Sequence, residues 1–357
     1  MARLGRDRTP VLFAVTTSVL SGVVLAVLTK GLQLGISAGA TLGWAALVSA
    51  VVAVAFWAAF AVKTRKGPKA AFLMTSAFEQ KYYVAALVQQ VHRALDREDI
   101  DLVLKVPDRD YDAGAQAHHL RRIASKKHCY LGGIVVAGEV ARLREDLAAF
   151  CRASRLPVVF SDLEPFPTES EYPDHTAFIG YDTGELGELA GQWLVGQLRG
   201  RDRPGVLIIA SREHDSRQKR CEKVLRSALP DVDVTTDDRC EFVRSRACSA
   251  VRAHLRHWEA GRRLDAIFCT NDEMALGALD ALATTASAAT RDTVVISVDG
   301  VLEARTLIDT GDSPLRATVV QDAHRLAVGA VDLLVKMHRG DAVPRRTILN
   351  AELYEGG

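Results

Sequence analysis

The sequence has almost no net charge and few aromatic residues. Lys and Arg total 45 against 44 Asp and Glu, a formal charge of +1, and aromatic residues make up 6% of 357 positions. A balanced charge argues against a chain whose main partner is nucleic acid or an acidic surface. The scarcity of aromatics, with abundant alanine, favours a helix-rich α/β protein over an all-β one.

Cysteine pairs of the kind that bind metals are also absent. None of the six cysteines forms a CxxC pair, and no histidine stands at metal-finger spacing, so neither a metal nor another cofactor is indicated. Cys151 and Cys269 lie in or beside apolar segments and are expected to be core thiols. Scattered reduced thiols favour a cytosolic environment. Because no cysteine precedes Cys129, a lipid-modified N-terminal cysteine is excluded.

Enzyme signatures are missing as well. The sequence has no GxSxG elbow, no Walker loop, no HExxH and no GxGxxG after the first strand predicted beyond residue 68. Gly184, Gly187 and Gly191 lie in a helical stretch, where they favour close helix packing over phosphate binding. The chain is therefore expected not to be an enzyme.

Charge is absent from two long runs near the N-terminus. Thr9–Thr29 and Ala40–Val62 contain no charged residue and are strongly apolar, and each reaches the roughly 20 residues that a bilayer-spanning helix needs. We expect a transmembrane hairpin over residues 1–66, with helices at about 10–29 and 41–62. A cleaved signal peptide is the alternative for the first run, and the second apolar run argues against it.

Positive residues flank this hairpin on both outer sides. The link between the helices holds only Lys30, and the outer flanks carry Arg3, Arg6, Arg8, Lys63, Arg65, Lys66 and Lys69. Since cytoplasmic flanks carry the excess of Lys and Arg, both ends should lie inside the cell. The prediction is a multi-pass cell-membrane protein with a cytoplasmic binding domain, and an extracytoplasmic domain is the alternative.

From Pro68 onward, short apolar runs alternate with helical patterns. Strand-like runs include Ala70–Thr75, Gly205–Ala210 and Thr293–Val298, and Tyr82–Leu95 and Asp322–Met337 have helical periodicity. Strands separated by helices imply parallel sheets built from right-handed βαβ units. The length fits two such sheets better than one.

A polar residue recurs at the carboxyl ends of these strands, where open α/β sheets bind ligands. Arg217 begins the helix after one strand, and four others directly follow strands: Asp162, Asn271, Asp299 and Gln321. Asn271 and Asp299 have an equally good interpretation as turn formers or helix caps. Taken together, these planar groups offer the paired donors and acceptors that a hydroxyl-rich ligand requires.

Three segments carry a family resemblance. Asn271–Ala278 is close to NDxMALGA, and Val295–Gly300 and Ala317–Gln321 support it. In these motifs the chain, from about Lys69 to Leu349, resembles the ribose/galactose-type periplasmic binding proteins and the ligand-binding half of LacI-type repressors.

This resemblance implies an α/β fold of two lobes, each a parallel sheet flanked by helices, joined by three crossings. The implied lobes are 68–181 with 322–350, and 182–321 with 351–357. By position, the strand-end residues and Arg217 match ligand-binding positions. At the first strand–helix turn, Gln80 matches a polar position, and Tyr82 and Tyr83 match stacking aromatics.

The sequence departs from the family pattern at three places. Leu163 stands where sugar binders often have an arginine, Arg244-Ser245-Arg246 replaces an expected aromatic, and Glu79 adds a carboxylate at the first turn. These departures suggest a ligand other than ribose, or a more cationic one.

The resemblance and the apolar runs together predict a membrane-anchored, non-catalytic receptor. It would close on a sugar, polyol or nucleoside-like ligand and signal to a membrane or signalling protein, without binding nucleic acid. Alternatives are the extracellular solute-binding component of a sugar ABC transporter and a LacI-like regulator remnant, which would lack DNA-binding helices. A cleft enzyme is the other class, with Asp162 near Glu79 as its candidate pair.

Overall fold

A computed structural model describes residues 69–77, 82–258, 263–285 and 290–356, and the single helical positions 29, 30, 47, 50, 51 and 54. The predicted spans at 10–29 and 41–62 therefore lie almost entirely outside the described residues. Among the described residues, no helix is long and apolar enough to cross a bilayer. The unit Pro68–Gly357 contains both sheets.

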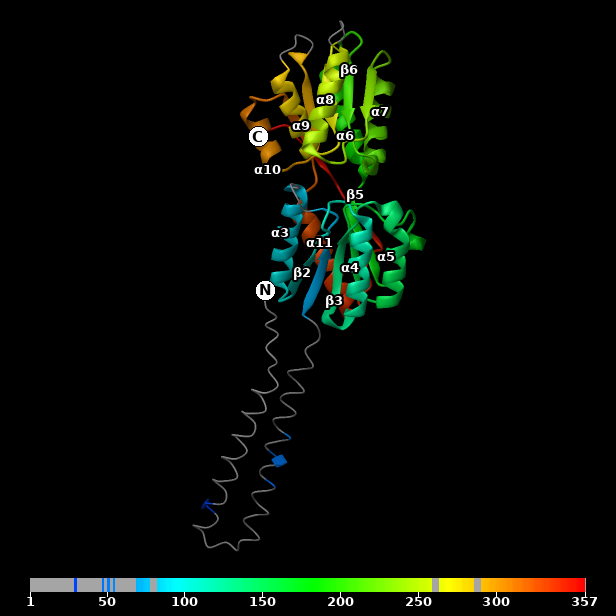
Figure 1. Cartoon of the computed structure of the whole chain (residues 1–357), viewed down its shortest axis with the longest axis vertical. Helices are drawn as coiled ribbons and strands as arrows, with labels where there is room; N and C mark the ends of the chain where they lie inside the picture. The colour runs from blue at the N-terminus through cyan, green and yellow to red at the C-terminus, as the bar shows by residue number, and fades with distance from the viewer. Residues whose placement is uncertain are drawn as a thin grey trace. The chain divides into compact units, whose positions relative to one another are not determined.

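The first sheet has six parallel strands in the order β11-β5-β4-β3-β1-β2 (Figure 1). Its strands are β1 (Ala70–Met74), β2 (Asp101–Lys105), β3 (Tyr130–Val136), β4 (Val158–Ser161), β5 (Thr176–Tyr181) and β11 (Arg346–Leu349). Its helices are α3 (Tyr82–Arg97), α4 (Ala113–Ser125), α5 (Val140–Ser154) and α11 (Ala323–Arg339). We call this part the first lobe.

The second sheet has the order β12-β10-β9-β8-β6-β7, and only the β10–β12 pair is antiparallel. Its strands are β6 (Gly205–Ile209), β7 (Asp233–Asp237), β8 (Ala266–Cys269), β9 (Val294–Asp299), β10 (Leu315–Val320) and β12 (Glu352–Tyr354). Its helices are α6 (Thr183–Leu198), α7 (Asp215–Ala228), α8 (Arg244–Trp258), α9 (Asp272–Thr284) and α10 (Leu302–Thr310). This part is the second lobe.

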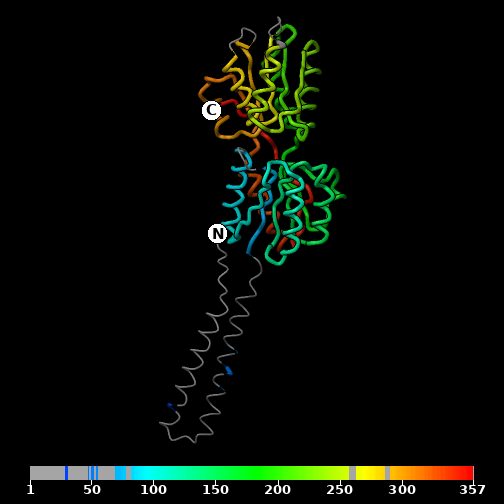
Figure 2. Tube along the Cα trace, viewed as in Figure 1, coloured from blue at the N-terminus to red at the C-terminus, as the bar shows by residue number. Residues whose placement is uncertain are grey.

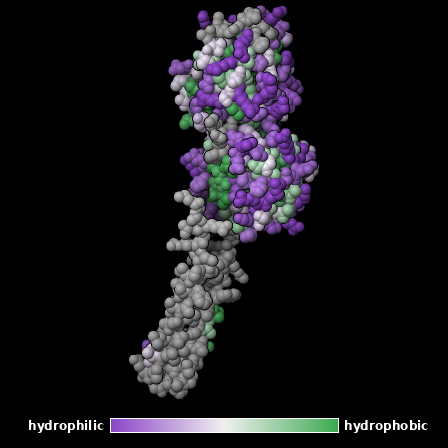
Figure 3. Space-filling model, viewed as in Figure 1, coloured by the Kyte–Doolittle hydropathy of each residue, from purple (hydrophilic) through white to green (hydrophobic). Residues whose placement is uncertain are grey.

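Continuous apolar strands explain the parallel sheets. β3, β6 and β8 are buried along their whole length, as expected when helices cover both faces of a sheet. Two hydrophobic clusters lie on opposite faces of each sheet. The visible surface of both lobes is mainly hydrophilic (Figure 3). The two-lobed α/β architecture expected from the sequence is confirmed.

The chain passes between the lobes three times (Figure 2). The crossings lie between β5 and α6, between β10 and α11, and between β11 and β12. Tyr181 links the first two, because its hydroxyl accepts a hydrogen bond from the Asp322 amide at 2.8 Å. The carboxyl ends of both sets of parallel strands meet near these crossings, and this places the site.

Candidate functional site

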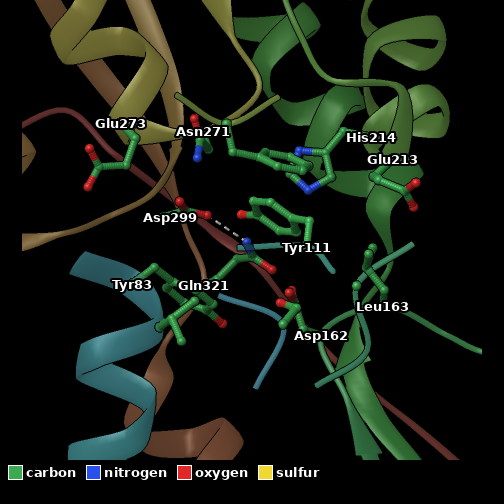
Figure 4. Close-up of a pocket in the computed structure, with 14 residues that line it drawn as sticks. Tyr83, Tyr111, Asp162, Leu163, Glu213, His214, Asn271, Glu273, Asp299 and Gln321 are labelled. Atoms are coloured by element: carbon green, nitrogen blue, oxygen red, sulfur yellow. Dashed lines mark hydrogen bonds between the residues drawn. The ribbon is translucent and has the colours of Figure 1, made fainter. Parts of the chain in front are cut away.

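One narrow cavity between the lobes brings the strand-end residues together. Asp162 follows β4 in the first lobe, Asn271 precedes α9 and Asp299 ends β9 in the second, and Gln321 lies on a crossing; all four line the cavity. Tyr83, from the first turn of α3, lines it as well (Figure 4). The cavity volume is about 50 Å³, more than one water molecule needs.

The buried polar residues make specific contacts. Gln321 Nε2 donates to Asp299 Oδ1 at 2.8 Å, the dashed line in Figure 4. Asn271 Oδ1 accepts from the Met274 amide at 3.0 Å, so this side chain caps α9 while it lines the cavity. The cap interpretation of Asn271 is therefore correct, and it is compatible with a place in the site.

Arg217 lies behind the cavity rather than on its lining. The side chain is 1% exposed, and its guanidinium donates to the Thr270 carbonyl. Its Nε, like the Tyr83 hydroxyl, is buried with no hydrogen-bond partner in the described part of the chain. Burial lowers the pKa of Arg217, while Asp299 and Asp162 oppose that shift. Two donors thus remain available beside the cavity.

The remaining predicted residues are placed differently. Glu79 and Gln80 lie outside the described residues. The Tyr82 side chain is exposed and lines an adjoining groove that shares Tyr83, Asp299 and Gln321 with the cavity. Its backbone amide donates to Glu273 Oε1 at 3.3 Å. Both tyrosines line this groove, and of the two only Tyr83 also lines the cavity.

Several residues that sequence reasoning missed also line the cavity. Tyr111 comes from the loop before α4, His214 and Phe242 come from the second lobe, and Glu273 is the second residue of α9. The Tyr111 and Phe242 rings lie 5.0 Å apart, and the Phe242 and His214 rings 4.5 Å apart at 66°. Figure 4 shows the Tyr111 ring between Asn271 above and Gln321 below.

Phe242 accounts for the aromatic that seemed to be missing at 244–246. It lies just before α8, whereas Arg244 binds Asp280 through two hydrogen bonds of 2.8 and 3.0 Å. The family pattern led us to expect this aromatic at 244–246, within the first turn of α8, whereas Phe242 lies two residues before the helix begins. A nearby aromatic in the sequence was the only available signal.

Backbone strain concentrates at this cavity. Four of the nine non-glycine residues with positive φ in the described part line it: Tyr111 (φ 61°), Asp162 (73°), Phe242 (59°) and Asp299 (120°). Such conformations cost on the order of 1–3 kcal/mol each and persist where surrounding structure enforces them, often at ligand sites. Their clustering supports a functional role for the cavity.

Burial controls the ionisation of the lining groups. It raises the pKa of the Asp162 carboxyl, against the opposing effect of Arg217. Burial and the neighbouring Asp272 raise the pKa of Asp299 well above its usual range. Burial and Arg217 hold the pKa of His214 well below 6.5, so this imidazole is neutral near pH 7.

Comparison with known proteins agrees with this architecture. Residues 71–342 match the model of the periplasmic binding protein domain. The chain belongs to the periplasmic binding protein domain family. Within it, the chain is similar to a putative rhizopine-binding protein of Rhizobium meliloti, with 28% identity over 207 residues. That match covers 56% of this chain and 63% of the relative's length.

Two solved structures share the fold of this chain at low sequence identity. A glucose-galactose binding protein from Geobacillus stearothermophilus aligns with a TM-score of 0.69 at 19% identity, covering 81% of this chain and 98% of the other. A solute-binding protein of an ABC transporter from Bacillus halodurans, with bound myo-inositol, gives 0.70 at 19% identity, covering 81% and 95%. At this identity the likeness establishes the fold.

Proposed function

We propose that this periplasmic binding protein family member is a membrane-anchored, non-catalytic receptor that closes on a sugar or polyol and signals to a partner. One observation carries the proposal: polar side chains from both lobes, Asp162 on one side and Asn271 and Asp299 on the other, converge on one cavity. Carboxylates and amides so placed match the donors and acceptors of adjacent hydroxyl groups.

Ligand would bind by lobe closure. A cavity of about 50 Å³ is narrow for a sugar ring, so the lobes must separate to admit it and close again around it. Hydrogen bonds to charged groups contribute roughly 1.5–3 kcal/mol each. A few of them would supply micromolar affinity, about −8 kcal/mol. Ligand favours the closed state only by the difference between its affinities for the two states.

The comparisons support the ligand class and the absence of catalysis. The relatives are named as binding rhizopine, glucose and galactose, or as holding bound myo-inositol. The candidate enzyme pair gains no support, because Glu79 lies outside the described residues and Arg217 is the charged neighbour that acts on Asp162. A binding site accounts for the polar residues at the cavity.

Delivery of solute to an ABC transporter is the second candidate. A periplasmic binding protein of the arabinose ABC transporter from Shewanella shares the fold, with a TM-score of 0.68 and 19% identity. That function needs the domain outside the cytoplasm, whereas the positive flanks of the apolar runs favour the inside.

A thermal-shift screen of the full-length chain against sugars, polyols and nucleosides tests the binding function. We expect one polyhydroxylated class to raise the unfolding midpoint. At a ligand concentration of 100 times Kd, the free energy of unfolding should increase by about 2.7 kcal/mol. If no compound in these classes raises the midpoint, the proposal is wrong.

Reporter fusions at Gly357 test the anchor and its orientation. A green fluorescent protein fusion should fluoresce and co-sediment with membranes, because the cytoplasm lies on the side of the positive flanks. An active alkaline phosphatase fusion would place the domain outside and favour the transporter function. A fusion found only in the soluble fraction would contradict the anchor.

A further inference from the structure

We propose that the base of the first lobe binds anionic lipid headgroups of the membrane that anchors the chain. This docking rests on the proposed anchor and uses a surface outside the cavity between the lobes. Exposed basic residues at or just beyond the carboxyl ends of α4 and α5 form the surface. We call it the basal patch: Arg122, Lys126, Lys127, Arg152 and Arg155.

The basal patch lies at the amino-terminal edge of the first sheet. Lys127 begins a 3₁₀ helix, η1 (Lys127–Cys129), that leads directly into β3, whose first residue pairs with Ala70 of β1. The Lys127 ammonium donates to the Ala153 carbonyl at 3.5 Å, so the ends of α4 and α5 lie side by side. Because the carboxyl ends of the strands meet near the crossings, this edge is the end of the first lobe away from the second lobe (Figure 1).

Neighbouring acids do not neutralise the basal patch. None of its five residues is ion-paired with another described residue. α4 contains no acidic residue, and the two acids of α5 lie in its middle, where Asp146 pairs with Arg121 at 3.9 Å. Burial lowers the pKa of Lys105, and Arg122 and Lys126 lower it further. Positive charges at this end of the lobe therefore act on one another.

Other basic residues at the same edge have acidic partners. Lys69 pairs with Asp99, and Arg345 pairs with Asp174 at 3.4 Å. Such pairs contribute little net charge, so the basal patch is where positive charge remains unbalanced. The formal charge of +1 for the whole chain does not reveal the patch, because acids elsewhere offset it.

The chain enters the first sheet at this edge, and this favours a lipid partner. Lys69, the residue before β1, stands seven residues after Val62, where the second predicted span ends. Seven residues reach at most about 25 Å when fully extended. With that span in a bilayer, the edge would lie close to the lipid headgroups. Each Lys or Arg near an anionic leaflet strengthens association roughly fivefold, and this attraction falls off within about 10 Å at 0.1 M salt.

Cys129 provides a direct probe of docking. Its side chain is exposed beside the patch, whereas Cys248 is half-buried and the other cysteines are buried. The full-length chain with Cys248→Ser would be reconstituted into nanodiscs of phosphatidylcholine alone, or of phosphatidylcholine and phosphatidylglycerol at two to one. A polyethylene-glycol maleimide should modify Cys129 at least about fivefold more slowly in the anionic discs. About 1 M NaCl, which shortens the Debye length to about 3 Å, should remove the difference.

Two triple variants separate the basal patch from charge elsewhere. One removes three patch charges and should abolish the difference between the two lipids: Lys126→Gln with Lys127→Gln and Arg155→Gln. The matched control removes three exposed charges from α7 in the second lobe and should keep the difference: Lys219→Gln with Lys223→Gln and Arg226→Gln. Each variant is compared with itself in the two lipids, so changes in thiol reactivity cancel.

The outcomes distinguish failure of the patch from failure of the anchor. Equal modification rates of the wild type in both kinds of disc, or an undiminished difference in the patch variant, would overturn the lipid docking while the anchor stands. A chain that does not enter the discs lacks the anchor. It should then still co-sediment with vesicles of the anionic mixture and not with phosphatidylcholine vesicles, and binding to neither would overturn the docking as well. A rise in unfolding midpoint with inorganic phosphate alone would assign the patch to a soluble anion instead.

Discussion

At the scale of single residues, Asn271 has two structural roles. Its Oδ1 caps α9 through the Met274 amide, and its side chain lines the cavity. A helix that begins at a cavity needs a capping side chain at the cavity's edge, so the cap and the proposed ligand role of one asparagine are compatible. Sequence alone could name the residue without choosing between them.

Replacing Asn271 with alanine should therefore have two separable effects. We expect a loss of about 1 kcal/mol in the free energy of unfolding, because the cap is lost. We also expect loss of the ligand-induced rise in unfolding midpoint. Asp182→Ala is the matched control, since Asp182 caps α6 through two amides and does not line the cavity. Equal ligand-induced shifts in both variants would remove Asn271 from the site.

Asp272 shows how a buried carboxylate can serve the fold beside the site. It is fully buried and accepts from the Ser297 and Thr318 hydroxyls and from the Val301 amide at 2.7 Å. These bonds connect the start of α9 to β9, β10 and the turn after Asp299. Burial nevertheless raises its pKa from 3.8 to about 6.

The sign of this shift predicts a pH dependence of stability. Between pH 3.8 and about 6 the unfolded state releases the Asp272 proton and the folded state retains it. The contribution of Asp272 to stability is thus greatest at low pH and is lost as pH rises through this window, by roughly 1–3 kcal/mol. Urea unfolding across the window should show a smaller fall with rising pH in Asp272→Asn than in the wild type. Parallel pH profiles would contradict the assignment.

At the scale of secondary-structure elements, α6 and α7 pack at glycine positions. A Cβ at Gly187 would lie 2.0 Å from the Arg217 carbonyl oxygen, and one at Gly191 would lie 2.9 Å from the Val224 Cβ. The prediction of close helix packing is confirmed for Gly187 and Gly191, whereas a Cβ at Gly184 would meet only the capping oxygen of Asp182 at 3.1 Å. The contact also positions the turn of α7 that carries Arg217, so helix packing and the site are connected.

Two alanine substitutions in α6 should differ in sign. Gly187→Ala should destabilise the protein by about 1–3 kcal/mol and weaken ligand binding, because the methyl group displaces the backbone of Arg217. Gly196→Ala meets nothing within 4 Å and should stabilise by up to about 1 kcal/mol through helix propensity. Thermal and urea unfolding measure both changes. Equal effects would show that the close contact has no energetic consequence.

Some elements carried weaker signals in the sequence. The central strands were predictable because they are uninterrupted apolar runs, but β7, β11 and β12 were missed. These three lie at or near sheet edges, contain charged or threonine residues, and have three to five residues each. A short edge strand is partly solvated, so apolar patterning does not mark it.

At the scale of the whole unit, the proposed lobe closure depends on the three crossings. The Tyr181 hydroxyl accepts from the Asp322 amide, which joins two of the three crossings. The proposed closure would require these crossings to move together, since the cavity is lined from both lobes. Loss of this link should loosen the hinge and enrich open conformations.

Tyr181→Phe should therefore weaken ligand affinity about fivefold, consistent with loss of roughly 1 kcal/mol of hydrogen bonding. Small-angle scattering should show a larger radius of gyration without ligand and recovery with saturating ligand. Tyr172→Phe is the control, because its hydroxyl donates to Glu164 within the first lobe at 3.0 Å. Identical scattering from both variants would contradict a hinge role for Tyr181.

The sequence alone determined the fold class, the strand-end polar residues and the family, because burial periodicity and short motifs are local properties of a chain. Only the tertiary structure showed that Tyr83 lines the cavity while Tyr82 does not, and that Arg217 lies behind the lining. It also brought Tyr111 and Phe242 together from separate lobes. Such placements depend on how two sheets face each other, and no pattern within one segment records that arrangement.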